Sequence, residues 1–251
     1  MRHHQNVYAA VASARPRIRA FEPGEAAKRT FDIGLAVALL LLIAPIILMI
    51  VVAIKIDSPG PVLFRARRVG LRGTEFAMLK FRKMYDGAVG PALTAADDAR
   101  FTRVGRFLAQ TKLDEIPQLV NVLMGEMSLV GPRPEDPSFI ELEPDRYRAI
   151  LGVRPGITGL SQLAFARESE VLDPADRTGH YVRAIFPQKL LLDTLYATSR
   201  SMRMDLAILH WTLVAVVARR HVAVNRMSGK LTHRNRRVVY NEPAVNASEA
   251  A

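Results

Sequence analysis

The chain has 251 residues, enough for one catalytic unit with a membrane element and too few for two full-sized domains. It contains no cysteine, which excludes a disulfide framework, a thiolate nucleophile and a Cys-ligated metal site. Its formal net charge of +11 indicates an anionic partner. Nucleic acid, anionic lipid and phosphorylated substrates all fit that charge.

The N-terminal part divides into a basic stretch and an apolar run. Residues 1–27 are basic and lack regular apolar spacing, so they predict a flexible arm. The run from Ile33 to Ile54 has 22 residues without a charge. At about 1.5 Å per residue it reaches roughly 33 Å as a helix, enough to cross a bilayer. A cleaved signal peptide and a buried helix fit less well, because the run starts late, is long and has no polar stripe.

The topology of this run is open from the residues alone. Basic residues flank it on both sides, which satisfies the positive-inside rule best if both ends stay on the cytoplasmic side. Pro45 lies near the middle and disrupts a helix interior by about 3 kcal/mol. The run is therefore either a re-entrant hairpin that turns back at Pro45 or a kinked helix that spans the bilayer.

A basic region follows the apolar run. Residues 57–61 predict a rigid turn, and the stretches VLFRARRVG and FAMLKFRKM predict short strands. Between Pro61 and Lys112 lie 11 Lys or Arg and four acidic residues, a local net charge of +7. This region predicts either phosphate binding or a solvated face near anionic lipid.

An acidic pair precedes the next predicted helix. Apolar residues from Leu113 onward recur at helical spacing. Proline is tolerated only in the first turn, so Pro117 places Asp114 and Glu115 at or just before the helix start, with Gly125 as the predicted stop. The helix dipole there favours ionised carboxylates, as a nucleophile or a Mg²⁺ ligand requires. Ordinary capping residues are the alternative for an isolated pair.

Two proline-rich loops and an apolar segment complete the pattern. Gly131-Pro132-Arg133-Pro134 predicts a stiff loop whose guanidinium suits contact with a phosphate, and residues 154–159 repeat the theme with Arg154. Residues 206–220 are apolar but too short to span a bilayer, so they predict an interfacial helix or, equally, a helix in the core. The tail from Asn241 predicts disorder.

Four motifs in this order resemble the bacterial sugar transferase family, the small monotopic polyprenyl-phosphate sugar-1-phosphate transferases. The most specific motif is TKLDEIPQLVNVLMGEMSLVGPRP, from Thr111 to Pro134. The others are VRPGITGLSQL, MLKFRKM and KRTFDIGLAVALLLL. The resemblance covers residues 28–220, most of the chain.

The resemblance implies an architecture. Members of this family imply an α+β, mostly helical fold for the chain, as a monotopic membrane protein. The fold is expected to have one re-entrant apolar helix kinked at Pro45 and amphipathic interfacial helices. The implied division is a flexible basic arm (1–27), a re-entrant membrane helix (28–56), a catalytic domain (57–225) and a basic, then disordered tail (226–251). The catalytic domain is expected on the cytoplasmic face of the bacterial inner membrane.

The resemblance also implies a reaction. Asp114 takes the position of the nucleophile, which attacks the sugar-bearing phosphorus of a UDP-sugar, expels UMP and forms an aspartyl phospho-sugar intermediate. Polyprenyl (undecaprenyl) phosphate then displaces the aspartate, and synthesis of a lipid-linked glycan begins. Glu115 takes the position of the partner carboxylate that holds Mg²⁺ at the diphosphate. Lys80, Arg133 and Arg154 match basic positions and are expected to bind phosphate.

The implied partners are the UDP-sugar donor, the polyprenyl phosphate acceptor and membrane lipid, with no nucleic acid; a homo-oligomer is compatible with the pattern. One departure concerns the donor. Relatives commonly carry an Arg near the donor five residues before the nucleophile, whereas this chain has Ala109. We expect Arg106, Gln110 or Lys112 to supply the contact, or turnover to be reduced. The alternative function is therefore a catalytically weak or inactive relative that acts as a membrane-bound interaction protein.

Overall fold

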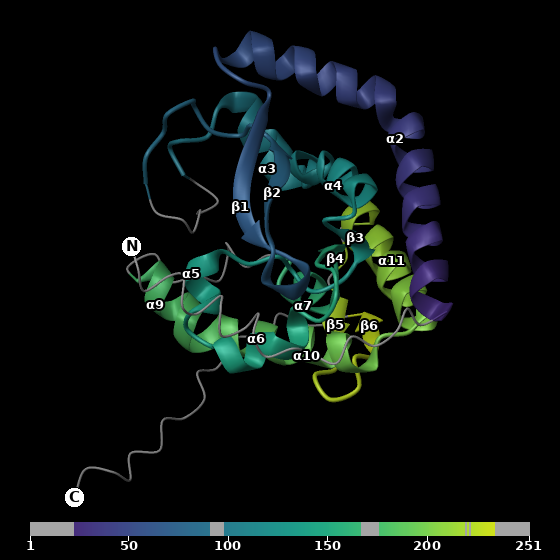
Figure 1. Cartoon of the computed structure of the whole chain (residues 1–251). Helices are drawn as coiled ribbons and strands as arrows, with labels where there is room; N and C mark the ends of the chain where they lie inside the picture. Colours follow the sequence, from purple (N-terminus) through teal and green to yellow (C-terminus); the bar gives the residue numbers. More distant parts are fainter. Residues whose placement is uncertain (1–22, 91–97, 167–175, 219, 221, 234–251) are drawn as a thin grey trace, which may run out of the picture.

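The computed structural model describes residues 23–90, 98–166, 176–218, 220 and 222–233. Its fold is mostly helical, as predicted, and the described residues also form three two-stranded sheets (Figure 1). The α-helices are α2 (Pro23–Asp57), α3 (Arg103–Thr111), α4 (Gln118–Met124), α5 (Pro137–Ile140), α6 (Pro144–Ile150), α7 (Leu160–Ala164), α9 (Arg177–His180), α10 (Phe186–Ser199) and α11 (Met202–Val217). The strands are β1 (Leu63–Val69), β2 (Glu75–Phe81), β3 (Ser128–Val130), β4 (Gly156–Thr158), β5 (Val222–Val224) and β6 (Leu231–His233). Shorter helical turns are η1 (Leu71–Gly73), η2 (Leu113–Glu115) and the π-helical η3 (Tyr181–Ile185).

Helix α2 contains the apolar run. It has 35 residues, and within the described part of the chain it is the one helix long and apolar enough to cross a membrane. Leu41 and Leu42 near its middle are 73% and 75% exposed. Figure 1 shows α2 running beside α11 and then turning over the top of the molecule. Pro45 lies inside the helix, and its missing amide donor and ring clash account for such a bend.

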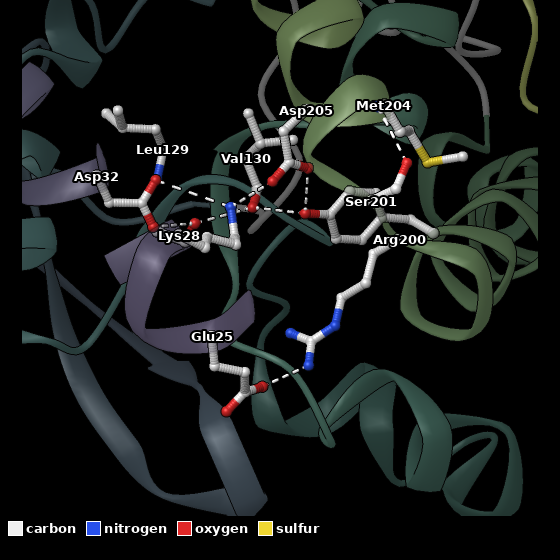
Figure 2. A network of polar contacts seen from close by, with 11 residues as sticks. Glu25, Lys28, Asp32, Leu129, Val130, Arg200, Ser201, Met204 and Asp205 are labelled. Atoms are coloured by element: carbon white, nitrogen blue, oxygen red, sulfur yellow. Dashed lines mark hydrogen bonds and ion pairs between the residues drawn. The ribbon is translucent and has the colours of Figure 1, made fainter. Parts of the chain in front are cut away.

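The N-terminal end of α2 is anchored by buried charges (Figure 2). Lys28 lies between Asp205 of α11, at 2.8 Å, and Asp32 one turn further along α2, at 3.7 Å. Asp32 accepts a hydrogen bond from the Ser128 hydroxyl at 2.7 Å, and Tyr196 donates to Asp205 at 2.7 Å. Both carboxylates are almost fully buried, so this end of the helix is tied to β3, α10 and α11.

The C-terminal end of α2 is anchored to a different part of the same domain. Arg82 donates to the carbonyl oxygens of Ser58 and Pro59, at 2.7 and 2.6 Å, immediately after the helix. Asp57 accepts a hydrogen bond from the backbone N–H of Val104 at 3.0 Å, at the start of α3. Ile54 packs in a small apolar cluster beside these contacts. Both ends of the long apolar helix therefore contact the domain that follows it.

The β1–β2 hairpin confirms the two predicted basic strands. The strands are antiparallel, with a register that runs from Leu63 opposite Phe81 to Val69 opposite Glu75. The hairpin carries Lys80 near its end, next to the turn that contains the acidic pair.

Strands β3 and β4 bring the two proline-rich loops together. They pair in parallel, with Ser128 opposite Gly156 and Val130 opposite Thr158. A Cβ on Gly156 would lie 2.0 Å from the backbone nitrogen of Gly131, so this close approach requires glycine. The pairing therefore places the loop of Arg133 beside the loop of Arg154.

Helix α11 is the predicted apolar segment, and one of its faces packs in the core. Ile208 is fully buried in the main core, while Leu213 and Val217 are exposed. One face therefore packs on the domain and the other face presents apolar side chains. An interfacial position for that outer face stays a prediction.

Two element ends differ from the predicted domain boundaries. Helix α2 begins at Pro23, so residues 23–27 are helical; proline is favoured at a first helical position, and Glu25 pairs with Arg200 (Figure 2). The boundary predicted after residue 225 falls in the turn between β5 and β6, where the Asn225 side chain accepts hydrogen bonds from the next backbone amides. Residues 1–22 and the tail from Asn241 lie outside the described residues.

Candidate active site

The acidic pair lies in a helical turn just before α4, as predicted. Asp114 and Glu115 belong to η2, Pro117 occupies the N-cap of α4, and Gly125 ends that helix at a φ of 86°. The preceding residue, Lys112, adopts a left-handed conformation with a φ of 62°. This reversal separates α3 from η2 and turns the acidic pair toward the β1–β2 hairpin.

A buried amide fixes the distance between α4 and the hairpin. The Asn121 side chain accepts from the backbone N–H of Leu79 and donates to the carbonyl oxygen of Ala77, both at 2.9 Å. Asn121 is fully buried. Its side chain bonds both a backbone N–H and a backbone carbonyl oxygen of β2, the groups that a neighbouring strand would otherwise pair with. The end of β2, which carries Lys80, is therefore held against the acidic turn.

Glu115 lies between two cations. Its Oε1 atom is 2.9 Å from Nζ of Lys80 and 3.5 Å from Nη2 of Arg133. Burial alone would raise the pKa of Glu115, but the charges of Lys80 and Arg133 outweigh burial and hold the pKa well below its usual value. Glu115 is therefore ionised at neutral pH, and the structure brings three of the predicted site residues together.

Asp114 pairs with a lysine that the sequence analysis did not single out. Nζ of Lys83 lies 3.3 Å from Oδ2 of Asp114, whose side chain is 3% exposed. In a continuous strand, residues 80 and 83 would point to opposite faces. Because β2 ends at Phe81, the chain turns and both lysines reach the acidic pair. Lys83 belongs to the motif FRKM, but its contact with Asp114 could be recognised only once the end of β2 at Phe81 was known.

The residues expected to supply the donor contact in place of an Arg at position 109 lie in α3 and at its C-cap, and that contact stays a prediction. Within the described part of the chain, Arg106, Gln110 and Lys112 form no hydrogen bond or ion pair with Asp114. The cation at Asp114 comes from the end of β2 and not from α3.

Arg154 lies away from the acidic pair. Its Nε atom donates to the carbonyl oxygen of Gly125 at 3.0 Å, at the C-terminal end of α4. The seven residues of α4, about 10 Å at 1.5 Å per residue, separate that contact from the acidic pair. In this structure Arg154 caps a helix, and a role in phosphate binding stays a prediction.

The acidic pair fits a magnesium ion that also binds substrate phosphate. No group of three or more His, Asp or Glu in the described residues could hold a metal by itself. Mg²⁺ commonly binds through one or two carboxylates together with substrate phosphates and water. Both cations at Glu115 contact Oε1, and the side chain is 19% exposed, so the carboxylate is not fully enclosed by protein. The residues present therefore match a site in which Mg²⁺ would be held by the protein together with substrate phosphate, and not a site made of protein ligands alone.

The fold and the site together are typical of a membrane-associated protein that binds a phosphorylated substrate. A long apolar helix accompanies a buried and a partly buried carboxylate, and three cations lie beside them. Charge-assisted contacts from lysine and arginine are the usual way to hold phosphate.

The chain belongs to the bacterial sugar transferase family, whose model matches residues 24–219. A UDP-glucose:undecaprenyl-phosphate glucose-1-phosphate transferase of Caulobacter vibrioides is 47% identical over 141 residues, 54% of this chain and 53% of that protein. An undecaprenyl-phosphate glucose phosphotransferase of Komagataeibacter xylinus is 37% identical over 195 residues, 74% of this chain and 35% of that protein. The exopolysaccharide production protein PSS of Rhizobium leguminosarum bv. phaseoli is 38% identical over 202 residues, 76% of this chain and 96% of that protein.

The family predicted from the four motifs is confirmed. The chain spans about half the length of the Caulobacter relative and about a third of the Komagataeibacter relative, but nearly all of the Rhizobium relative.

Proposed function

We propose that the chain transfers a sugar-1-phosphate from a UDP-sugar to polyprenyl (undecaprenyl) phosphate and releases UMP. The observation that carries the proposal is the acidic pair in η2, in which Asp114 and Glu115 each face a separate lysine. The names of the Caulobacter and Komagataeibacter relatives support the donor and acceptor classes. The name of the Rhizobium relative supports a role in exopolysaccharide production, and transfer to a lipid carrier would place the reaction at the start of that or a related synthesis.

The proposed route is covalent. A carboxylate oxygen of Asp114 bonds to the sugar-bearing phosphorus, the bond from that phosphorus to the bridging oxygen breaks, and UMP leaves with the bonding electrons. An oxygen of the polyprenyl phosphate then attacks the same phosphorus, and Asp114 departs as a carboxylate. The two steps replace one difficult transfer. Asp114 is buried beside Lys83, and this cation suits a nucleophile that must approach an anionic substrate.

The neighbouring side chains have separate proposed roles. Glu115 would hold Mg²⁺, which when bound offsets negative charge on the donor diphosphate. Lys80 keeps Glu115 ionised, and Arg133 is held at the same carboxylate by its proline-flanked loop. The Arg133 side chain is 34% exposed, and its proposed role is a contact with a donor phosphate.

We also propose that α2 enters the membrane from the cytoplasmic face and returns to it. A straight helix of 35 residues would be about 52 Å long at 1.5 Å per residue, and its ends would emerge on opposite sides of a hydrocarbon core about 30 Å thick. Here Lys28 and Asp57, near the two ends, both contact the following domain. These contacts, with the interior Pro45 and the basic flanks, support a monotopic protein of the inner membrane.

The reaction is tested with purified protein, Mg²⁺, polyprenyl phosphate and a panel of UDP-sugars, with UMP release as the readout. We expect Asp114→Asn and Glu115→Gln to lose activity, whereas Asp145→Asn, on the exposed surface, keeps it. An Asp114→Asn protein that releases UMP as fast as the parent would contradict the covalent route. An inactive parent with every donor would favour the alternative, a membrane-bound interaction protein, which Ala109 motivates.

A further inference from the structure

Asp114 is nearly inaccessible, although the proposed chemistry requires it to reach a phosphorus atom. Its side chain is 3% exposed, and the neighbouring Lys83 side chain, whose Nζ lies 3.3 Å from Oδ2, is 29% exposed. The lysine is therefore the more open member of the pair. From solvent, the Lys83 side chain is therefore more accessible to a donor than the Asp114 carboxylate.

The backbone of Lys83 is held more closely than its long, partly exposed side chain. The Lys83 carbonyl oxygen accepts a hydrogen bond from the Thr102 backbone N–H at 3.1 Å, and Gly105 of α3 packs directly against it. The side chain has four flexible carbons, and its Nζ lies 5.8 Å from the centre of the Phe101 ring. Any adjustment at this residue must therefore come from the side chain.

The second lysine is held more tightly. Lys80 lies within β2, its side chain is 11% exposed, and its Nζ is 2.9 Å from Glu115. Lys83 has a longer contact with its acid and lies beyond the end of the strand. Of the two lysines, Lys83 is the one that can exchange a carboxylate for another anion.

We propose that Lys83 covers Asp114 in the free enzyme and moves to the donor diphosphate when the donor binds. The move adds a charge-assisted contact to the phosphate and uncovers the carboxylate at the moment when the phosphorus is in reach. Lys83 is then a donor-binding residue that also controls access to Asp114. This inference rests on the proposed function, because that function assigns the donor and the role of Asp114.

The test is a double-variant cycle on the binding of UDP, which carries a diphosphate but no sugar to transfer. Affinities are measured with Mg²⁺ for the parent, Lys83→Met, Asp114→Asn and the double variant. Lys83→Met should weaken UDP binding by about 10- to 100-fold, the value of a hydrogen bond to a charged group. Lys83→Arg should restore most of the affinity. Lys230→Met, in the exposed turn between β5 and β6, is the matched control and should bind UDP like the parent.

The Asp114→Asn variant separates the proposal from simple charge repulsion. If Lys83 must leave Asp114 in order to bind the diphosphate, Asp114→Asn tightens UDP binding, and Lys83→Met abolishes that gain. If the carboxylate merely repels the diphosphate, the gain persists in the Lys83→Met background and the proposal is overturned. Parent-like UDP binding by Lys83→Met also overturns it.

Folding and the proposed function are controlled separately. Thermal unfolding of each variant shows whether it is folded, and Lys83→Gln, which keeps a donor for Asp114, takes the place of Lys83→Met in the cycle if the methionine variant does not fold. Failure of the parent to release UMP from any UDP-sugar would reject the proposed function. UMP release that is lost in Asp114→Asn, together with parent-like UDP binding by Lys83→Met, would reject only the role of Lys83.

Discussion

Gly105 packs against the backbone of Lys83 so closely that a Cβ at position 105 would lie 1.9 Å from the Lys83 carbonyl oxygen. The contact packs the first turn of α3 against the residues that follow β2, and it fixes the position of the Lys83 backbone. The contact matters for the site because Nζ of Lys83 lies only 3.3 Å from Oδ2 of Asp114, so a shift of the Lys83 backbone would change that ion pair.

Gly105→Ala should therefore destabilise the protein and reduce UMP release. Over-packing of this kind costs about 1–3 kcal/mol of the free energy of unfolding, and the forced shift moves Lys83 relative to Asp114. Thermal unfolding and the UMP assay measure the two effects. Gly24→Ala is the control, because a Cβ there meets no atom within 4 Å. A Gly105→Ala protein as stable and active as the parent would show that the contact is not needed.

Lys28→Met should destabilise the anchor at the N-terminal end of α2. The change leaves Asp32 and Asp205 buried without the cation that lies between them (Figure 2). Removal of one partner from a buried ion pair costs about 3–5 kcal/mol of the free energy of unfolding.

Arg148→Met removes an exposed ion pair with Asp145 and should cost less than about 1 kcal/mol. The Lys28→Met/Asp205→Asn double variant should lose less than the sum of the two single variants, because the second change removes one of the uncompensated charges. Equal losses of stability for Lys28→Met and Arg148→Met would contradict the anchor.

Asp193 should make stability depend on pH. Burial raises the pKa of Asp193 to about 7, partly opposed by the hydrogen bond that the Ser161 hydroxyl donates at 2.6 Å. The unfolded chain releases the proton near pH 3.8, so the folded state holds a proton that the unfolded state lacks between these values. Stability from this group is therefore present at low pH and is lost as the pH rises through about 7.

Asp193→Asn has no carboxyl group to titrate, so its melting temperature relative to the parent should rise between pH 4 and pH 7 and then level off. Melting curves over this range measure the difference. Asp145→Asn, whose parent side chain is 91% exposed, should give a constant difference. A constant difference for Asp193→Asn as well would mean that Asp193 is ionised in the folded protein.

The topology of α2 can be tested by labelling single cysteines in this cysteine-free chain. Ala26→Cys, near the start of the helix, and Ala77→Cys, in β2, are both exposed positions. In membrane vesicles of one orientation we expect both to react with an impermeant thiol reagent from the same side. Labelling from opposite sides would establish a spanning helix. Leu42→Cys, in the exposed apolar middle, should react slowly from either side if α2 enters the membrane as proposed.

Local patterns predicted several elements because their causes are local. The proline at 117 and the glycine at 125 set the limits of a short helix, since proline is tolerated only in a first turn and glycine accepts a left-handed φ. The stretches VLFRARRVG and FAMLKFRKM, which follow a predicted turn, predicted both strands. The start of α2 was harder to predict, because the pairing of Glu25 with Arg200 joins residues 175 positions apart.

The sequence by itself determined the family, the long apolar helix and the acidic pair, since each is written in a continuous run of residues. The tertiary structure decided which lysine or arginine pairs with which carboxylate. Lys80 and Arg133 meet at Glu115, and Lys83 reaches Asp114, because Asn121 fixes α4 to β2 and Gly105 fixes α3 to the strand end. The same long-range contacts leave Arg154 at the far end of α4. Such pairings depend on where strands end and how closely backbones approach, and no local pattern specifies either.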